Sequence, residues 1–140
     1  MCIVKLSVIV PIYNSELYLA DCLESLVHQN FKDGEYEVIC VNDGSQDSSL
    51  EIIRDYERKY PFVRCYSKKN EGIAATRNLG LKMARGRYIT FVDSDDYIVA
   101  ESLEKLVNEM ERRDVTLLTF GYQCIGETEH YCNEKISKVE

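Results

Sequence analysis

The sequence lacks the long apolar runs that anchor a chain in a membrane. No stretch approaches about 18 apolar residues, because Lys5, Ser7 and Pro11 interrupt the most hydrophobic part of the N-terminus. Residues 1–14 also lack the basic leader and small-residue cleavage site of a signal peptide, and the sequence has no N-x-S/T acceptor site. We therefore expect no transmembrane segment in this chain.

The six cysteines lack the spacing of a metal or redox site. They are scattered, without a C-x-x-C pair and without a histidine at zinc spacing. Cys22 and Cys40 stand in apolar surroundings, where a free thiol behaves as a small hydrophobe. Reduced cysteines predict a cytoplasmic chain. Peripheral attachment at the inner face of the membrane, through residues beyond this chain, stays open.

Positive charge is also scarce. The 17 Lys and Arg residues face 24 Asp and Glu residues, which gives a formal net charge of -7. This balance argues against a nucleic-acid partner, which requires a basic surface. One window, residues 64–87, contains seven basic residues and a single acid, Glu71. The window predicts either a solvated helix face or a basic region beside an acidic site.

Five apolar runs predict the strands of a mostly parallel sheet. They are residues 6–12, 36–42, 63–67, 88–92 and 115–122. Helical patterns alternate with them, near residues 16–29, 48–60, 72–85 and 103–110. The run at 88–92 is almost continuously apolar, which predicts a strand buried on both faces. We therefore predict an α/β fold with a Rossmann-like, mostly parallel sheet flanked by helices.

Three aspartates follow the fourth predicted strand within four residues: Asp93, Asp95 and Asp96. In a parallel sheet this position lies at the carboxyl edge, where ligands bind. Carboxylates crowded there repel each other, so each protonates or meets a cation. Hard oxygen ligands suit Mn2+ or Mg2+ completed by water and phosphate oxygens. Taken alone, the same residues also fit a solvated turn before a helix.

The sequence has neither of the glycine-rich loops, G-x-G-x-x-G and G-x-x-x-x-G-K-[ST], that usually bind phosphate in such folds. Instead, Asn14 follows the first predicted strand and Asp43 the second. Carboxylates repel a diphosphate, so we expect a metal ion to lie between the carboxylates and the phosphates. A carboxylate that does not bind the metal is expected to accept a hydrogen bond from a sugar hydroxyl or a base N–H. This pattern predicts a nucleoside diphosphate ligand.

Four blocks of the sequence together resemble the nucleotide-binding half of family 2 glycosyltransferases, which have the A-type fold. In the family's order, they are Ser7–Asn14 (SVIVPIYN), Val41–Asp47 (VNDGSQD), Asn70–Leu81 (NEGIAATRNLGL) and Gly86–Tyr97 (GRYITFVDSDDY). The resemblance implies a nucleotide-sugar-binding domain at 1–122 and the start of a truncated acceptor-side region at 123–140. It also implies inverting transfer from a nucleoside-diphosphate sugar, with UDP favoured, to a hydroxyl of a saccharide or lipid-linked acceptor.

The resemblance implies roles for individual residues. The substrate-binding residues it implies are Pro11, Tyr13, Asn14, Asp43, Arg77 and Asp93. Asp43 is expected to accept a base N–H, and Arg77 to lie near the nucleotide. Asp95 is the expected ligand of Mn2+ or Mg2+, with Asp93 on the ribose or in the metal shell.

The catalytic base of such enzymes belongs to the acceptor-side half, after the matched blocks. Glu127, Glu129 and Glu134 match no family motif, so none is assigned this role, and we expect a chain that binds the donor but lacks transfer activity. Two alternatives stay open. One is a noncatalytic nucleotide-binding or scaffold domain. The other is an aspartyl phosphatase, whose nucleophile pair resembles Asp93-Ser94-Asp95 but follows its first strand.

Overall fold

Four parallel strands form the centre of the fold in the computed structural model, which describes residues 3–125. The strands are β1 (Leu6–Ile12), β2 (Tyr36–Asp43), β3 (Val63–Lys68) and β4 (Tyr88–Phe91). They lie in the order β3-β2-β1-β4, and each neighbouring pair is parallel. The helices are α1 (Leu19–Val27), α2 (Ser49–Lys59), α3 (Ile73–Met83) and α4 (Ser102–Arg113). The predicted α/β fold with a parallel sheet flanked by helices is confirmed.

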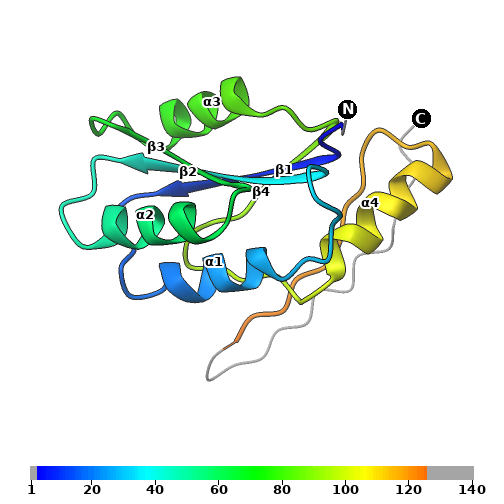
Figure 1. Ribbon diagram of the computed structural model, residues 1–140, viewed down its shortest axis with the longest axis horizontal. Coiled ribbons are helices and arrows are strands. Elements are labelled where there is room, and N and C mark those ends of the chain that lie inside the picture. The colour runs from blue at the N-terminus through cyan, green and yellow to red at the C-terminus, as the bar shows by residue number, and fades with distance from the viewer. Residues whose placement is uncertain (1–2, 126–140) are drawn as a thin grey trace. The chain divides into compact units, whose positions relative to one another are not determined.

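Helices cover both faces of the central strands, α3 on one side and α1 and α2 on the other (Figure 1). Every residue of β1 and β2 is accordingly buried. Under α3, Ile9, Ile39 and Val41 form an apolar cluster with residues of the helix. Gly80 permits this close approach, since a Cβ atom there would lie 2.3 Å from the Cγ2 atom of Ile9.

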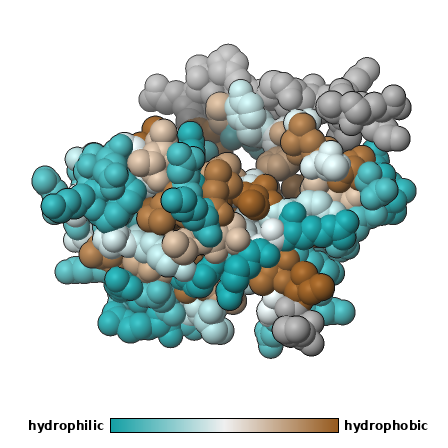
Figure 2. Space-filling model, turned by 90° about the horizontal axis from the view of Figure 1, so that it is seen from above, coloured by the Kyte–Doolittle hydropathy of each residue, from teal (hydrophilic) through white to brown (hydrophobic). Residues whose placement is uncertain are grey.

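The expectation that the fourth strand is buried on both faces is wrong. Strand β4 pairs with β1 and ends the described sheet, and its burial alternates along the strand. Ile89 and Phe91 are 44% and 41% exposed. Phe91 is in register with Ile9, so their side chains lie on the same face of the sheet. Helix α3 packs on Ile9 and therefore covers this face at β1, whereas the same face is open at β4. Figure 2 views the molecule from this side and shows apolar surface among polar side chains.

The fifth strand predicted at residues 115–122 is also wrong, because this segment forms neither helix nor strand. Its apolar residues Leu117, Phe120 and Tyr122 are exposed. An apolar run becomes a strand only where a neighbouring strand satisfies its backbone groups, and within residues 3–125 this run gains no such neighbour.

The chain divides into two compact units, residues 1–104 and 105–140. The sheet and helices α1 to α3 belong to the first unit. Residues 126–140, with the three glutamates considered above, lie outside the described part, so the domain boundary expected at residue 122 stays a prediction. Within residues 3–125, no helix has the length and apolar character required to cross a membrane.

Candidate functional site

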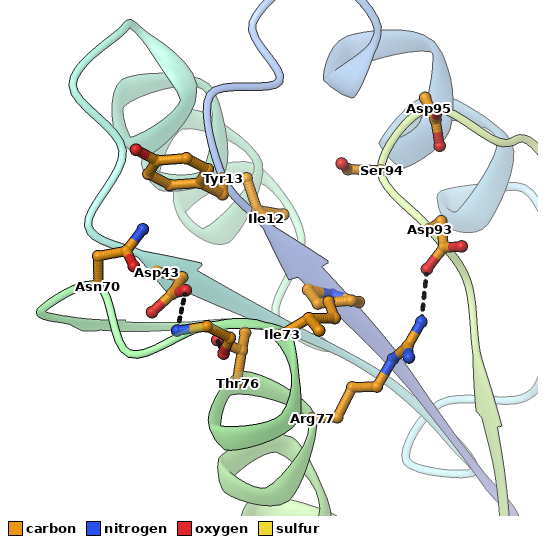
Figure 3. A pocket seen from close by; sticks show the side chains of 12 residues that line it. Ile12, Tyr13, Asp43, Asn70, Ile73, Thr76, Arg77, Asp93, Ser94 and Asp95 are labelled. Carbon is orange, nitrogen blue, oxygen red and sulfur yellow. Dashed lines mark hydrogen bonds and ion pairs between the residues drawn. The ribbon is translucent and has the colours of Figure 1, made fainter.

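A pocket of about 540 Å³ opens at the carboxyl edge of the sheet. Its walls come from the ends of β1 and β2, the start of α3 and the residues after β4 (Figure 3). The lining residues are Pro11, Ile12, Tyr13, Asp43, Asn70, Gly72, Ile73, Thr76, Arg77, Asp93, Ser94 and Asp95. Small-molecule sites typically have volumes of roughly 300–1,000 Å³, so the pocket suits a ligand of nucleotide size.

Asp43, the last residue of β2, holds one end of the pocket together. Its carboxylate accepts hydrogen bonds from Lys68 Nζ, from the Glu71 amide at 2.9 Å and from the Gly72 amide at 3.0 Å. Burial alone raises the pKa of Asp43, but these hydrogen bonds outweigh it and hold the pKa below its ordinary value. A carboxylate offers about four acceptor positions, so the hydrogen bonds from residues 3–125 leave one position on Oδ2 available.

Two glycines allow the loop before α3 to approach this carboxylate. Gly44 has a φ of +71°, and a Cβ atom there would lie 2.7 Å from the Asn70 amide nitrogen. Gly72 has a φ of +93°, which glycine adopts without strain. The loop therefore brings Asn70 into the pocket beside Tyr13 (Figure 3).

Arg77 and the acidic residues form the other end of the pocket. Nη2 of Arg77 donates to Oδ1 of Asp93 at 3.1 Å (Figure 3), and the guanidinium lies 5.7 Å from the centre of the Phe91 ring. Nε of Arg77 is buried without a hydrogen-bond partner among residues 3–125. The guanidinium has five N–H donors and the Arg77 side chain is 41% exposed, so the group can donate to a phosphate oxygen in the pocket through its accessible N–H groups.

The loop after β4 concentrates negative charge. Asp95 lines the pocket, whereas Asp96 does not. Burial, followed by the charges of Asp95 and Asp93, raises the pKa of Asp96. Burial and the same three carboxylates raise the pKa of the Cys22 thiol behind the loop to about 12. An added positive charge would relieve this repulsion.

These residues fit a metal site that is shared with a ligand. Among the described residues, no three His, Cys, Asp or Glu side chains are arranged to hold a metal ion by themselves. Mg2+ sites typically use one or two carboxylates and complete their shell with water and substrate phosphate. Asp93 and Asp95, both in the pocket lining, can supply such a pair.

The structure brings most of the predicted site residues together. Pro11, Tyr13, Asp43, Arg77, Asp93 and Asp95 line the pocket. Asn14 does not: it adopts a φ of 47°, donates its backbone N–H to Ser45 Oγ and accepts the Gln46 amide on its side chain. Its contacts join two loops beside the pocket. The roles predicted for all seven residues stay predictions.

Sequence reasoning missed several pocket residues, including Asn70, Thr76 and Ser94. It also did not decide whether the basic residues of the window 64–87 form a solvated helix face or lie beside the acidic site. In the structure Lys68 pairs with Asp43, and Arg77 pairs with Asp93. The signal for the first pair is the register of the sheet, which sets Lys68 opposite Asp43, and a single sequence does not reveal register.

A parallel α/β sheet with a polar pocket outside its carboxyl edge defines a Rossmann-like ligand-binding fold. Residues 7–136 match the model of Glycosyl transferase family 2. The chain belongs to this family.

Relatives and solved structures agree with this assignment. The chain is 44% identical over 117 residues to the poly(ribitol-phosphate) beta-glucosyltransferase of Bacillus spizizenii, covering 81% of this chain and 18% of that enzyme. S. aureus TarS, solved in complex with UDP-GlcNAc, is similar with a TM-score of 0.73 and 40% identity, covering 79% of this chain and 32% of that one.

A mannosyltransferase of Pyrobaculum calidifontis, solved with GDP-Man and Mn2+, shares the fold at a TM-score of 0.67 and 24% identity, covering 76% of this chain and 31% of that one. The chain thus spans a minor part of each of these three proteins.

Proposed function

We propose that this chain is the donor-binding part of a metal-dependent, inverting glycosyltransferase, and that its pocket holds a UDP-linked sugar. The observation that carries the proposal is the pocket between Asp43 and Asp95, with polar acceptors at one end and paired carboxylates at the other. The 40% identity to TarS, whose structure contains UDP-GlcNAc, supports uridine as the nucleoside.

The contacts support a division of labour within the pocket. Tyr13 offers a half-exposed ring to a base, and Asp43 offers its free acceptor position to a base N–H. Arg77, which lines the pocket, offers its partly exposed guanidinium to a phosphate oxygen. Asp93 and Asp95 would hold Mn2+ or Mg2+, which supplies positive charge to the leaving diphosphate when bound.

Transfer also requires an acceptor site and a base that deprotonates the acceptor hydroxyl. We place both outside residues 3–125, in the acceptor-side part of a longer protein, with a saccharide or lipid-linked acceptor. Cys22, Cys40, Cys65 and Cys124 are free thiols, which supports a cytoplasmic location. Attachment at the inner face of the membrane is compatible with this proposal.

Calorimetry of UDP binding, with and without Mn2+, tests the proposal. We expect Mn2+ to strengthen UDP binding to the wild-type chain, and Asp95→Asn to remove this gain because it removes a charged oxygen ligand. Asp33→Asn is the matched control, since Asp33 is an exposed aspartate in a turn outside the pocket lining. Equal UDP affinity with and without Mn2+ would contradict the proposal.

The alternatives predict different results. A noncatalytic domain would bind UDP with Mn2+, yet the longer protein would transfer no sugar. An aspartyl phosphatase would hydrolyse p-nitrophenyl phosphate and lose this activity in Asp93→Asn. Family membership and the position of Asp93 after β4, rather than after the first strand, argue against the phosphatase.

A further inference from the structure

A pair of hydroxyl groups joins two loops of the pocket that are distant in sequence. Ser15 follows β1, and its Oγ lies 2.6 Å from Oγ of Ser94, between the two carboxylates after β4. Both serines are partly buried. The contact connects the loop that contains Tyr13 to the loop that contains Asp93 and Asp95.

The surrounding contacts fix the direction of this hydrogen bond. Ser15 Oγ also donates to the backbone carbonyl of Tyr13 at 3.2 Å. A hydroxyl has one proton to donate, so while Ser15 donates to this carbonyl, Ser94 is the donor in the bond between the serines. The result is a chain of hydrogen bonds from Ser94 through Ser15 to Tyr13.

Ser15 is itself held firmly by the first residue of α2 and by the loop after β2. Its backbone N–H donates to Oγ of Ser49 at 2.8 Å, and Ser49 is fully buried. The next amide, that of Glu16, donates to Asp47 Oδ2 at 3.1 Å. Ser15 is therefore a fixed point against which a neighbouring loop can be positioned.

The acidic loop also has other supports, among them the Arg77 Nη2 donor to Asp93 Oδ1 at 3.1 Å. It is a turn closed by the Asp96 amide donating to the Asp93 carbonyl at 3.0 Å, and the Cys22 thiol donates to the same carbonyl at 3.6 Å. Ser94 is an inner residue of this turn. Fixing Ser94 restrains the backbone of this turn, which carries Asp93 and Asp95, while Arg77 holds the Asp93 carboxylate directly.

We propose that Ser15 is a positioning residue, which holds the Asp-Ser-Asp turn so that its carboxylates share a divalent cation with the donor diphosphate. This inference rests on the proposed function. Ser15 acts through Ser94 and does not itself line the pocket. The effect should therefore fall on the metal-dependent part of binding rather than on nucleotide binding as a whole.

The test compares UDP affinity with and without Mn2+ in Ser15→Ala, Ser94→Ala and the double variant. One hydrogen bond typically contributes about 0.5–1.5 kcal/mol, so we expect about twofold to tenfold weaker UDP binding with Mn2+. Affinity without Mn2+ should stay unchanged in Ser15→Ala, because Ser15 is outside the pocket lining; Ser94 lines the pocket, so its variants are compared by the ratio of the two affinities. The double variant should lose no more than either single variant, because both remove the same bond. Ser15→Thr, which keeps the hydroxyl, should restore the wild-type value.

Ser45→Ala is the matched control. Ser45 Oγ accepts the Asn14 amide at 3.0 Å, so this variant also removes a hydrogen bond to the loop after β1, but not one to the acidic loop. It should leave the ratio of the two affinities unchanged.

An unchanged ratio in Ser15→Ala and Ser94→Ala, with wild-type binding dependent on Mn2+, would overturn this inference and leave the proposed function intact. If wild-type UDP binding is itself independent of Mn2+, both proposals fail. If Ser15→Ala does not fold, Ser94→Ala gives the same comparison from the other side of the bond.

Discussion

Two buried acids on the same face of β2 lie at opposite ends of the sheet. Glu37 is near the start of the strand and Asp43 is its last residue, and their side chains are 2% and 5% exposed. Both carboxylates pair with basic side chains, and both have a pKa below the ordinary value. Burial and pKa direction therefore do not distinguish a structural acid from one at a binding site.

The difference lies in how many acceptor positions are filled. Oε1 of Glu37 accepts Ser7 Oγ at 2.6 Å and the Arg85 amide at 2.8 Å, while Oε2 accepts two hydrogen bonds from the Arg85 guanidinium. Arg64 forms a further ion pair at 2.9 Å. This carboxylate has no acceptor position for a ligand.

Asp43 accepts three hydrogen bonds and lines the pocket. The acid at the amino edge is thus saturated by the fold, whereas the acid at the carboxyl edge keeps one position on Oδ2. Free acceptor capacity next to a pocket is the feature that separates the two acids, and it is the feature that mutation can test.

The largest expected effect is the loss of stability in Glu37→Ala. Removing one partner from a buried ion pair typically costs about 3–5 kcal/mol. Arg85 is 62% exposed and can turn toward water, so we expect a decrease of about 2–4 kcal/mol in the free energy of unfolding. Urea unfolding followed by circular dichroism measures it.

Glu35→Ala is the control for this prediction. Glu35 pairs with Lys5 at 3.2 Å, with side chains 22% and 32% exposed, and a pair of this kind contributes about 1 kcal/mol or less. If Glu37→Ala were no more destabilising than Glu35→Ala, Glu37 and its arginine partners would not be the structural support that their contacts indicate.

Asp43→Asn should affect both stability and binding. The amide cannot accept all three native hydrogen bonds, and Lys68 loses the nearer of its two carboxylate partners while keeping Glu71 at 3.7 Å. We therefore expect a decrease of about 1–3 kcal/mol in the free energy of unfolding. UDP affinity should also fall, by at least about tenfold, because the free acceptor position is lost. Urea unfolding and calorimetry measure the two effects.

Glu37→Gln sharpens the comparison. It makes the same chemical change at the saturated acid, so it should reduce stability while leaving the UDP affinity of the folded protein unchanged. A comparable loss of UDP affinity in both variants would mean that the two ends of the sheet are not functionally distinct.

The sequence predicts the buried centre of the fold well and its margins poorly. The apolar runs that became β1 and β2 are long and rich in Val and Ile, and each found strands on both sides. The run at β4 looks similar, but it became an edge strand, and residues 115–122 became no strand at all. A pattern reports what a segment can form, whereas burial depends on its neighbours.

The site shows the same limit at the level of single residues. Motif position identified Asp43 and Asp95, because residues at strand ends gather at one edge of a parallel sheet. The partners that tune them come from register and loop packing. Lys68 lies opposite Asp43 on the neighbouring strand, and Ser15 contacts Ser94, which is 79 residues away in the sequence. Glu37 left a signal, a lone acid within an apolar run, but nothing in the sequence identifies its arginine partners.

Arg77→Gln should reduce stability less than Glu37→Ala or Asp43→Asn. Arg77 also pairs with an acid, but its side chain and that of Asp93 are 41% and 54% exposed. Exposed pairs contribute about 0–1 kcal/mol, and the contact with the Phe91 ring adds about 0.5–1 kcal/mol at such a site. We expect a decrease below about 1.5 kcal/mol in the free energy of unfolding. UDP binding should weaken more clearly, because the positive charge of the guanidinium is lost from the pocket lining. Lys82→Gln, at an exposed basic residue of α3 outside the pocket lining, is the control.

A stability loss in Arg77→Gln as large as that of Glu37→Ala, with UDP affinity unchanged, would contradict this prediction. Arg77 would then be a structural residue, like Glu37, and not part of the binding site.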